Sequence, residues 1–174
     1  MKIFGLAGWS GSGKTTLLVG LIPELTQLGL TVSTIKHAHH RFDIDTPGKD
    51  SYEHRRAGAT EVMVTSVDRW ALMHENRGEG EPDVDTLISR MSPVDLILIE
   101  GFKSYPHDKL EVHRPSVGKP LLANDDESIV AIASDAALTN IRCPVLDLGD
   151  VSMIAAFIAS HCGLGETAKD GATE

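Results

Sequence analysis

The chain has 174 residues with a formal net charge of −9, and 41% of them are hydrophobic. That length suits one domain with its own core, and the negative charge argues against sequence-independent binding to nucleic acid or to an anionic membrane surface. The two cysteines lack metal-ligand spacing, no signal peptide opens the chain, and no apolar run approaches the ~20 residues of a membrane helix. These features predict a cytoplasmic protein.

The first half of the chain alternates apolar runs with amphipathic stretches. Residues 2–8 form a short apolar run that ends in glycine, which is typical of a buried parallel strand. Leucines and isoleucines at helical spacing predict a helix over residues 15–28. Residues 31–37 then read as a second strand, and residues 48–59 as a short polar helix.

A hairpin is predicted next, because residues 61–66 and 69–75 are β-prone segments joined by a short turn. An amphipathic helix follows at residues 84–91, and residues 94–102 form a second apolar strand. The remaining elements are a last helix capped by Asp150 and three strands, at residues 109–114, 128–134 and 143–148. The pattern predicts one α/β domain over residues 2–162 with a mostly parallel sheet, followed by a disordered tail at residues 163–174.

The strongest motif is GWSGSGKT, Gly8–Thr15, which matches G-x-x-x-x-G-K-[ST] between a predicted strand and a predicted helix. Its glycines let backbone N–H groups converge on phosphate oxygens beside a helix N-terminus. Lys14 is expected to pair with the β- and γ-phosphates, and the Thr15 hydroxyl to ligate Mg²⁺. Together with the predicted sheet and hairpin, the motif predicts a nucleotide-binding domain with a three-layer fold of the P-loop NTPase type, to which the antiparallel hairpin is added. The predicted phosphate-binding residues are Gly8, Trp9, Ser10, Gly11, Ser12, Gly13, Lys14, Thr15, Thr16 and, from a later loop, Lys49.

A P-loop also needs a carboxylate for Mg²⁺, and the strand at residues 94–102 offers two. Asp95 begins this strand, ~15 Å from Glu100 at ~3.3 Å per residue. Ligands bind at the carboxyl ends of parallel strands, so Asp95 lies at the wrong edge of the sheet. Glu100 is the predicted magnesium ligand, and its alternative role is that of a solvated carboxylate at a strand end.

Histidines and carboxylates are dense in IKHAHHRFDIDTPGKDS, residues 35–51, which leave the same edge of the sheet. That position favours a loop facing substrate or phosphate, in which Asp45 or Asp50 would reach Mg²⁺. His37 and His39 face the same way on a strand, which also suits a transition metal. However, no cysteine and no nearby downstream histidine at ligand spacing completes a set of four ligands. The third reading is a merely polar surface loop.

The runs GWSGSGKTTLL, IKHAHHRFDID, PGKDSY, RWALM and DLILIEGFK, in this order and spacing, resemble the MobB family of adaptor proteins in molybdopterin-guanine dinucleotide biosynthesis. The resemblance covers about residues 2–160. It implies a P-loop fold that binds GTP, hydrolyses it weakly and forms a homodimer. It further implies a partnership with the molybdenum cofactor guanylyltransferase and with molybdopterin or its guanine dinucleotide. The residues expected to face the pterin or the partner are His37, His39, His40 and Lys103.

The guanine-reading residue is not obvious, because the chain has no N-K-x-D motif. The corresponding place, after the predicted strand at residues 128–134, offers Ser134 and Asp135. Asp135 is able to accept hydrogen bonds from the guanine N1 and N2 groups, but it would serve equally well as a turn cap.

Two other classes of protein remain open. A small-molecule kinase would need an arginine-bearing lid over the phosphates, and Arg55 and Arg56 are the only close basic pair in the sequence. A metallocentre-assembly GTPase would use the histidine cluster to deliver nickel or zinc. The enzymatic activity expected is at most a weak, Mg²⁺-dependent hydrolysis of GTP.

Overall fold

The computed structural model describes residues 1–38, 42–102 and 105–165. The chain groups into two compact units, of which unit 1 comprises Met1–His37 with Ser92–Glu174 and unit 2 comprises Ala38–Met91. Unit 2 is thus inserted in the sequence between two strands of unit 1. The domain bounds 2–162 remain a prediction, to which the structure adds this internal division.

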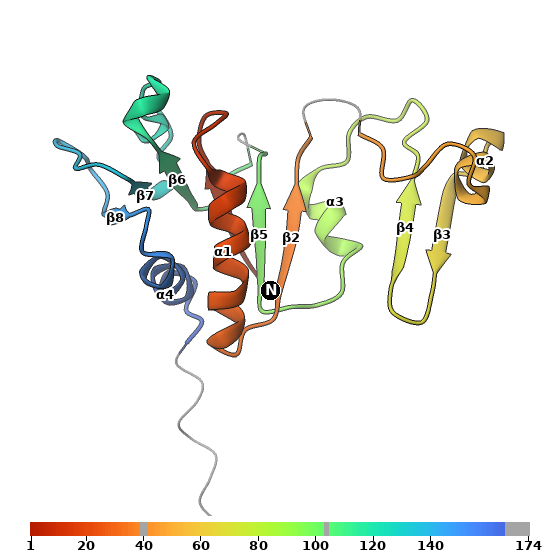
Figure 1. Ribbon diagram of the computed structural model, residues 1–174, viewed down its shortest axis with the longest axis horizontal. Coiled ribbons are helices and arrows are strands. Elements are labelled where there is room, and N and C mark those ends of the chain that lie inside the picture. Colours follow the sequence, from red (N-terminus) through yellow and green to blue (C-terminus); the bar gives the residue numbers. More distant parts are fainter. Residues whose placement is uncertain (39–41, 103–104, 166–174) are drawn as a thin grey trace, which may run out of the picture. The chain divides into compact units, whose positions relative to one another are not determined.

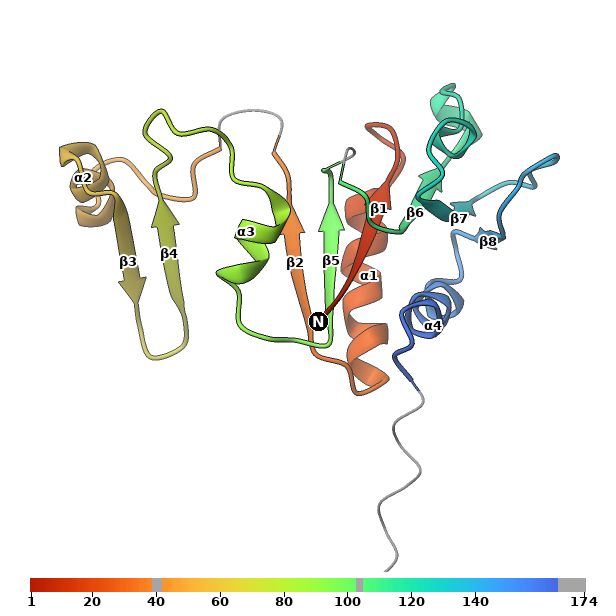
Figure 2. The ribbon, with the colours of Figure 1, turned by 180° about the vertical axis from the view of Figure 1, so that it is seen from behind.

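Unit 1 is built on a six-stranded sheet in which every pairing is parallel. Figure 2 shows β1 between β5 and β6. All carboxyl ends therefore meet at one edge, where the loop after β1 leads into the first helix (Figure 1). The predicted mostly parallel sheet is confirmed. In spatial order, the strands are β2 (Val32–Lys36), β5 (Leu96–Glu100), β1 (Lys2–Ala7), β6 (Lys109–His113), β7 (Ile129–Ser134) and β8 (Val145–Asp147).

Two helices, α1 (Lys14–Gln27) and α4 (Val151–His161), pack together and share one hydrophobic core with the sheet. Burying a leucine or isoleucine side chain contributes about 1.5–3 kcal/mol, so this face holds α1 firmly behind the loop that precedes it. The Asp150 carboxylate accepts a hydrogen bond from Met153 N at 2.9 Å, which confirms the predicted cap. The fully buried members of this core include Phe4, Leu21, Leu25, Leu96, Leu98, Leu110, Ile154 and Ile158.

The C-terminal end of α4 continues into the first residues of the predicted tail. Gly163 has φ +65°, and Leu164 N donates to Ala159 O at 2.7 Å. The Leu164 side chain packs on the core, which is the hydrophobic contact expected at such a helix end. The rest of the tail, from residue 166, lies outside the described residues.

Strand β6 carries buried charged side chains, which its sequence pattern does not predict. Lys109 is 2% exposed and donates to Tyr105 O at 2.9 Å and to Ser128 Oγ. The fully buried Glu111 accepts from the backbone N–H groups of Leu122 and Ala123, both at 2.9 Å. These bonds replace water for the buried charges and anchor the chain that follows β6, which contains the short 3₁₀ helices η1 (Pro115–Val117) and η2 (Leu122–Asn124).

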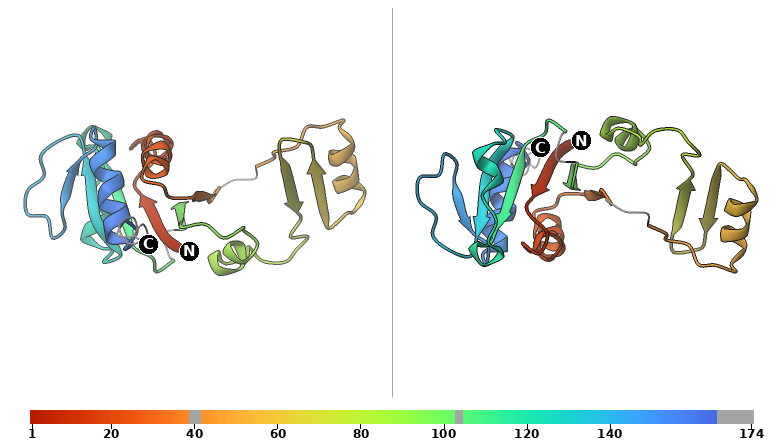
Figure 3. Two further views of the ribbon diagram at one scale, coloured as in Figure 1. Left: turned by 90° about the horizontal axis from the view of Figure 1, so that it is seen from below. Right: turned by 90° about the horizontal axis from the view of Figure 1, so that it is seen from above.

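Unit 2 contains the predicted hairpin, formed by β3 (Glu61–Thr65) and β4 (Trp70–His74), with Thr65 opposite Trp70. Helix α2 (Asp50–Ala57) lies beside β3 (Figure 3), and α3 (Val84–Ser89) is capped by Asp83. The hairpin confirms the antiparallel element of the predicted fold. Large apolar side chains remain exposed on it, namely Met63, Val64, Val67, Trp70 and Leu72.

Candidate nucleotide-binding site

The P-loop connects β1 to α1 and depends on glycine for its shape. Gly8, Gly11 and Gly13 have φ of +145°, +82° and +99°, a region that other residues rarely adopt. A Cβ on Gly8 would lie 2.6 Å from the Val112 carbonyl oxygen and 2.7 Å from Ser12 Oγ. The loop therefore closes tightly against β6 and presents its backbone at the N-terminus of a long helix, as an anion site requires.

Lys14 and Ser12 show that this loop fits a phosphate group. Lys14 Nζ donates to the carbonyl oxygens of Gly8 and Trp9 at 2.9 and 3.1 Å, so the ammonium group lies over the loop. The Ser12 hydroxyl is buried without a hydrogen-bond partner among the described residues. A buried unsatisfied hydroxyl is costly, and an oxyanion held by this loop would remove that cost.

Thr15 and Glu100, which the sequence predicts to be magnesium ligands, lie next to each other. Thr15 Oγ1 lies 3.3 and 3.4 Å from the two carboxylate oxygens of Glu100, which is 9% exposed at the end of β5. Two neighbouring ligands of an octahedral Mg²⁺ lie about 3 Å apart, because each bond is about 2.1 Å long. The two oxygen donors thus fit a magnesium ion. Lys36 Nζ, 3.7 Å from Glu100 Oε2, adds a cation that sequence reasoning missed.

Asp95 lies at the amino end of the sheet, as expected. Its carboxylate accepts hydrogen bonds from Thr31 N at 2.8 Å and Thr31 Oγ1 at 2.6 Å. These bonds lower the pKa of Asp95, the side-chain bond from Thr31 contributing most. Asp95 therefore ties the start of β5 to the start of β2.

The segments containing His37 and Gly101 meet beside Glu100. His37 N donates to Glu100 O at 2.8 Å, and its ring stacks on Phe102 with the centroids 4.5 Å apart. A Cβ on Gly101 would lie 2.6 Å from the His37 Cβ, so this approach requires glycine. Within the described ranges, no three His, Cys, Asp or Glu side chains gather as a metal site. Three predicted residues lie outside those ranges, namely His39, His40 and Lys103.

Of the two predicted base-reading residues, Ser134 ends β7 and Asp135 follows it. Ser134 is buried and its hydroxyl accepts from Ala136 N at 3.2 Å, which shapes the turn. Asp135 is exposed, and its Oδ2 accepts from Arg114 Nη1. Arg114 Nε also donates to Ser12 O in the P-loop at 3.1 Å. Sequence reasoning missed Arg114, and the available signal was its place directly after a strand that borders β1.

The sequence model of the MobB family, described as molybdopterin guanine dinucleotide synthesis protein B, matches residues 3–135. The chain belongs to the MobB family. The molybdopterin-guanine dinucleotide biosynthesis adapter protein of Escherichia coli (strain K12) is 46% identical over 161 residues, which cover 91% of each chain. The protein of the same name from Haemophilus influenzae is 40% identical over 158 residues, 91% of this chain and 88% of its own length.

Solved structures agree with this membership. The crystal structure of a molybdopterin-guanine biosynthesis protein B aligns with a TM-score of 0.74 at 28% identity, over 92% of this chain and 99% of that chain. A MobB homologue from Bacillus stearothermophilus aligns with a TM-score of 0.69 at 20% identity, a similarity that concerns the fold alone. The predicted P-loop NTPase-type fold is confirmed.

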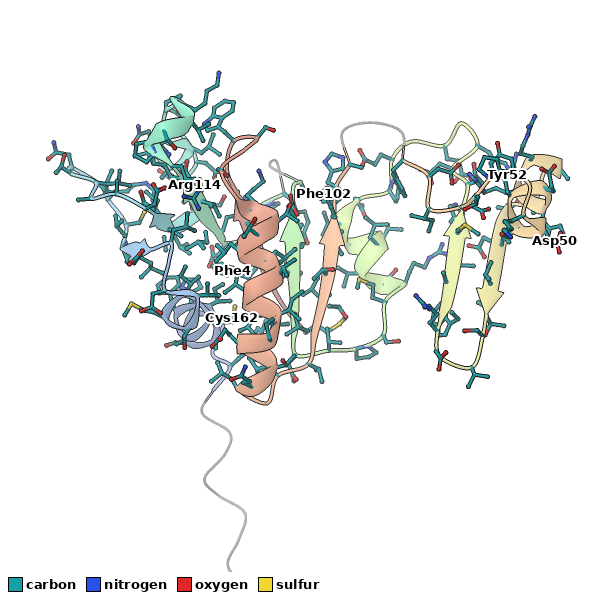
Figure 4. The ribbon with its side chains drawn as sticks, viewed as in Figure 1. Phe4, Asp50, Tyr52, Phe102, Arg114 and Cys162 are labelled. Carbon is teal, nitrogen blue, oxygen red and sulfur yellow. The ribbon has the colours of Figure 1, made fainter. Side chains whose placement is uncertain are left out.

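The remaining predicted ligands of this MobB-family chain belong to unit 2. Lys49 and Asp50 are exposed at the start of α2, on which Figure 4 labels Asp50. Asp45 instead bonds within its own unit. Its Oδ1 accepts from Thr46 N at 3.0 Å and from Ser51 Oγ at 2.9 Å, and its Oδ2 lies 3.7 Å from Arg55 Nε.

Arg55 is the centre of an ionic network in unit 2. Its guanidinium donates to Asp43 at 2.9 Å and to Glu75 at 3.0 Å. Hydrogen bonds to Asp43 and then Glu75 raise the pKa of Arg55. The backbone hydrogen bond from Asp45, followed by the side-chain bond from Arg55, lowers the pKa of Asp43. Arg55 thus joins α2 to the loop before it and to the residue that follows β4, which leaves it a poor candidate for a kinase lid.

Proposed function

We propose that this MobB-family chain is a GTP-binding adapter of molybdopterin-guanine dinucleotide biosynthesis with weak intrinsic GTPase activity. The observation that best supports nucleotide binding is that the Thr15 hydroxyl and the Glu100 carboxylate lie close together beside the P-loop, where Lys14 is held. The relatives named as adapter proteins support the biological role.

The nucleotide phosphates would bind to the residues of the P-loop, from Gly8 to Thr16. Thr15 and Glu100 would hold Mg²⁺, which neutralises phosphate charge when bound. Asp45, Lys49 and Asp50 stay predictions as further ligands. Asp135, with Ser134 shaping its turn, would read the guanine base, and this preference for GTP rests on the family as much as on the site.

The adapter role implies a partner enzyme, which we propose is the guanylyltransferase that joins GMP to molybdopterin. His37, stacked on Phe102 beside Glu100, would lie on the side of the site that meets the partner or the pterin. A homodimer is part of the proposal, and the exposed apolar side chains of the hairpin, such as Trp70 at 62% exposure, support an interface there.

Where the protein acts is the last part of the proposal. Among the described residues, no helix combines the length and apolar character needed to cross a membrane. Cys143 and Cys162 are both free thiols. The proposed location is the cytoplasm.

The test is the binding of fluorescent GTP with and without Mg²⁺ by Glu100→Gln, Thr15→Val and, as a matched control, Asp95→Asn. Asp95 directly precedes β5 and Glu100 ends it, so each change removes one negative charge at one end of the same strand. We expect the first two variants to lose the Mg²⁺-dependent gain in affinity and the control to keep it. A Glu100→Gln variant that keeps the full gain contradicts the magnesium assignment.

A further inference from the structure

Arg114 joins two parts of the site that are far apart in sequence. The β6–β7 register pairs His113 with Ser134, so Arg114 and Asp135 each follow the last paired residue at the carboxyl edge of the sheet. Figure 4 shows Arg114 at this edge. Its Nε donates to the P-loop carbonyl of Ser12 and its Nη1 to Asp135 Oδ2. One guanidinium therefore contacts the P-loop and the predicted base-reading carboxylate together.

The chemistry of the guanidinium makes this contact directional. Arginine presents its donors in a rigid planar fork, so fixing Nε on the Ser12 carbonyl also fixes the direction of the Nη1 bond. Lysine, with one flexible ammonium group, carries the charge without that geometry. The guanidinium also lies within van der Waals contact of the P-loop backbone, since a Cβ on Gly13 would lie 3.5 Å from Arg114 Nε.

Asp135 keeps acceptor capacity for a base in this arrangement. Only its Oδ2 bonds to Arg114, and Oδ1 accepts no hydrogen bond from the described part of the chain. Guanine presents N–H donors at N1 and N2, whereas adenine presents an acceptor at N1. A carboxylate held at a fixed distance from the phosphate loop therefore favours guanine over adenine.

We propose that Arg114 is the positioning residue for guanine specificity, holding Asp135 in register with the P-loop. The pair would supply from two strands what an N-K-x-D motif supplies from one loop. This inference rests on the proposed function, because it assumes that Asp135 reads the base. Asp135 lies in an exposed turn. If Arg114 orders its side chain before the nucleotide binds, the entropic cost of guanine binding is smaller.

The experiment measures dissociation constants for Mg·GTP, Mg·ATP and inorganic triphosphate with Arg114→Ala, Arg114→Lys and Asp135→Asn. Arg69→Ala is the matched control, since Arg69 lies in the hairpin turn of unit 2 and is exposed. In Arg114→Ala, GTP affinity should fall on the order of tenfold or more, while ATP and triphosphate change less than about threefold. Arg114→Lys should also lose most of the GTP preference, because the charge remains but the fork does not.

A double variant separates positioning from direct phosphate binding. If Arg114 acts through Asp135, then Arg114→Ala adds little further loss of GTP affinity in the Asp135→Asn background. Additive losses, or equal losses for GTP, ATP and triphosphate, would overturn the inference and make Arg114 a phosphate ligand or a structural tie. Melting curves of all variants test whether unfolding causes any loss of affinity.

The controls also distinguish this inference from the proposed function. If the wild-type chain prefers GTP and Arg114→Ala keeps the same ratio of GTP affinity to ATP affinity, only the role of Arg114 is overturned. A wild-type chain that binds ATP as tightly as GTP overturns both the role of Arg114 and the GTP assignment. If Asp135→Asn gains affinity for xanthosine triphosphate, the assumption that Asp135 reads the base is supported, because xanthine carries an acceptor where guanine carries the N2 donor.

Discussion

The Thr15 hydroxyl and the Glu100 carboxylate lie 3.3 Å apart, although 85 positions separate them in the chain. The parallel sheet makes this approach possible. Glu100 is in register with Leu6 on β1 and with Lys36 on β2, so the end of β5 meets the start of the P-loop. A hydroxyl, a carboxylate and the Lys14 ammonium thus gather at one edge without a dedicated loop to bring them together.

Lys14→Ala should weaken nucleotide binding strongly. The ammonium group is half-buried over the P-loop carbonyls, where it would meet the phosphates. Losing charge-assisted bonds worth about 3 kcal/mol raises the GTP dissociation constant about 100-fold. Titration calorimetry measures the change, with Lys2→Ala, at the opposite end of β1, as a charge-matched control. Unchanged GTP affinity in Lys14→Ala would show that this loop is not the site.

Local patterns predicted the P-loop and Glu100, since a motif lies within eight residues and strand polarity decides which carboxylate is at the ligand edge. The buried Lys109 and Glu111 were not predictable, because their partners come from residues 105 and 122–128. Arg114 was missed for the same reason, as its two partners are 102 and 21 positions away. The separation into two units likewise depends on tertiary contacts that a pattern of apolar residues does not contain.

GTP hydrolysis by the isolated chain should be slow, below about one turnover per second. The only glutamine in the sequence, Gln27, ends α1, about 20 Å along the helix from Lys14 at 1.5 Å per residue. Arg114 is bonded to Ser12 and Asp135, so it is held away from the role of an arginine finger. Phosphate release under saturating Mg·GTP measures the rate, with Lys14→Ala giving the background. Several turnovers per second without a partner would reveal a catalytic group that these residues do not account for.

Substituting Asp45 and substituting Asp50 should have different effects on stability. The Asp45 side chain is 8% exposed and bonded to Ser51 and Thr46, so Asp45→Ala should cost about 1–3 kcal/mol of unfolding free energy. Asp50 is exposed in the first turn of α2, where its removal should cost no more than about 1 kcal/mol.

The measurements for this pair are melting without ligand and GTP affinity with and without Mg²⁺. If Asp45→Ala melts normally but loses Mg²⁺-dependent affinity, its carboxylate is a ligand rather than a structural group. Loss of that affinity in Asp50→Ala alone would assign the metal contact to Asp50.

The last prediction concerns His107, whose ring lies against the backbone of β1. A Cβ on Gly5 would lie 2.3 Å from His107 Nε2, and this buried nitrogen has no hydrogen-bond partner among the described residues. The other ring nitrogen, Nδ1, lies 3.0 Å from Tyr105 O, to which it donates in the neutral tautomer we assign. Protonation would place a second N–H where no acceptor is available. Burial, and secondarily the charge of Lys109, therefore lower the pKa of His107 below its ordinary value of 6.5.

This lowered pKa gives stability a pH dependence of known sign. At a pH between the lowered pKa of His107 in the folded chain and its ordinary value of 6.5 in the unfolded chain, the unfolded chain binds the proton and the folded chain does not. The contribution of His107 to stability is therefore complete above about pH 6.5 and is lost as the pH falls below it. Chemical denaturation from pH 7.5 to 5.5 should show a steeper loss of unfolding free energy in wild type than in His107→Gln. His54→Gln, an exposed change on α2, serves as the control and should keep the wild-type slope. If His107→Gln also keeps that slope, the buried ring is not the titrating group.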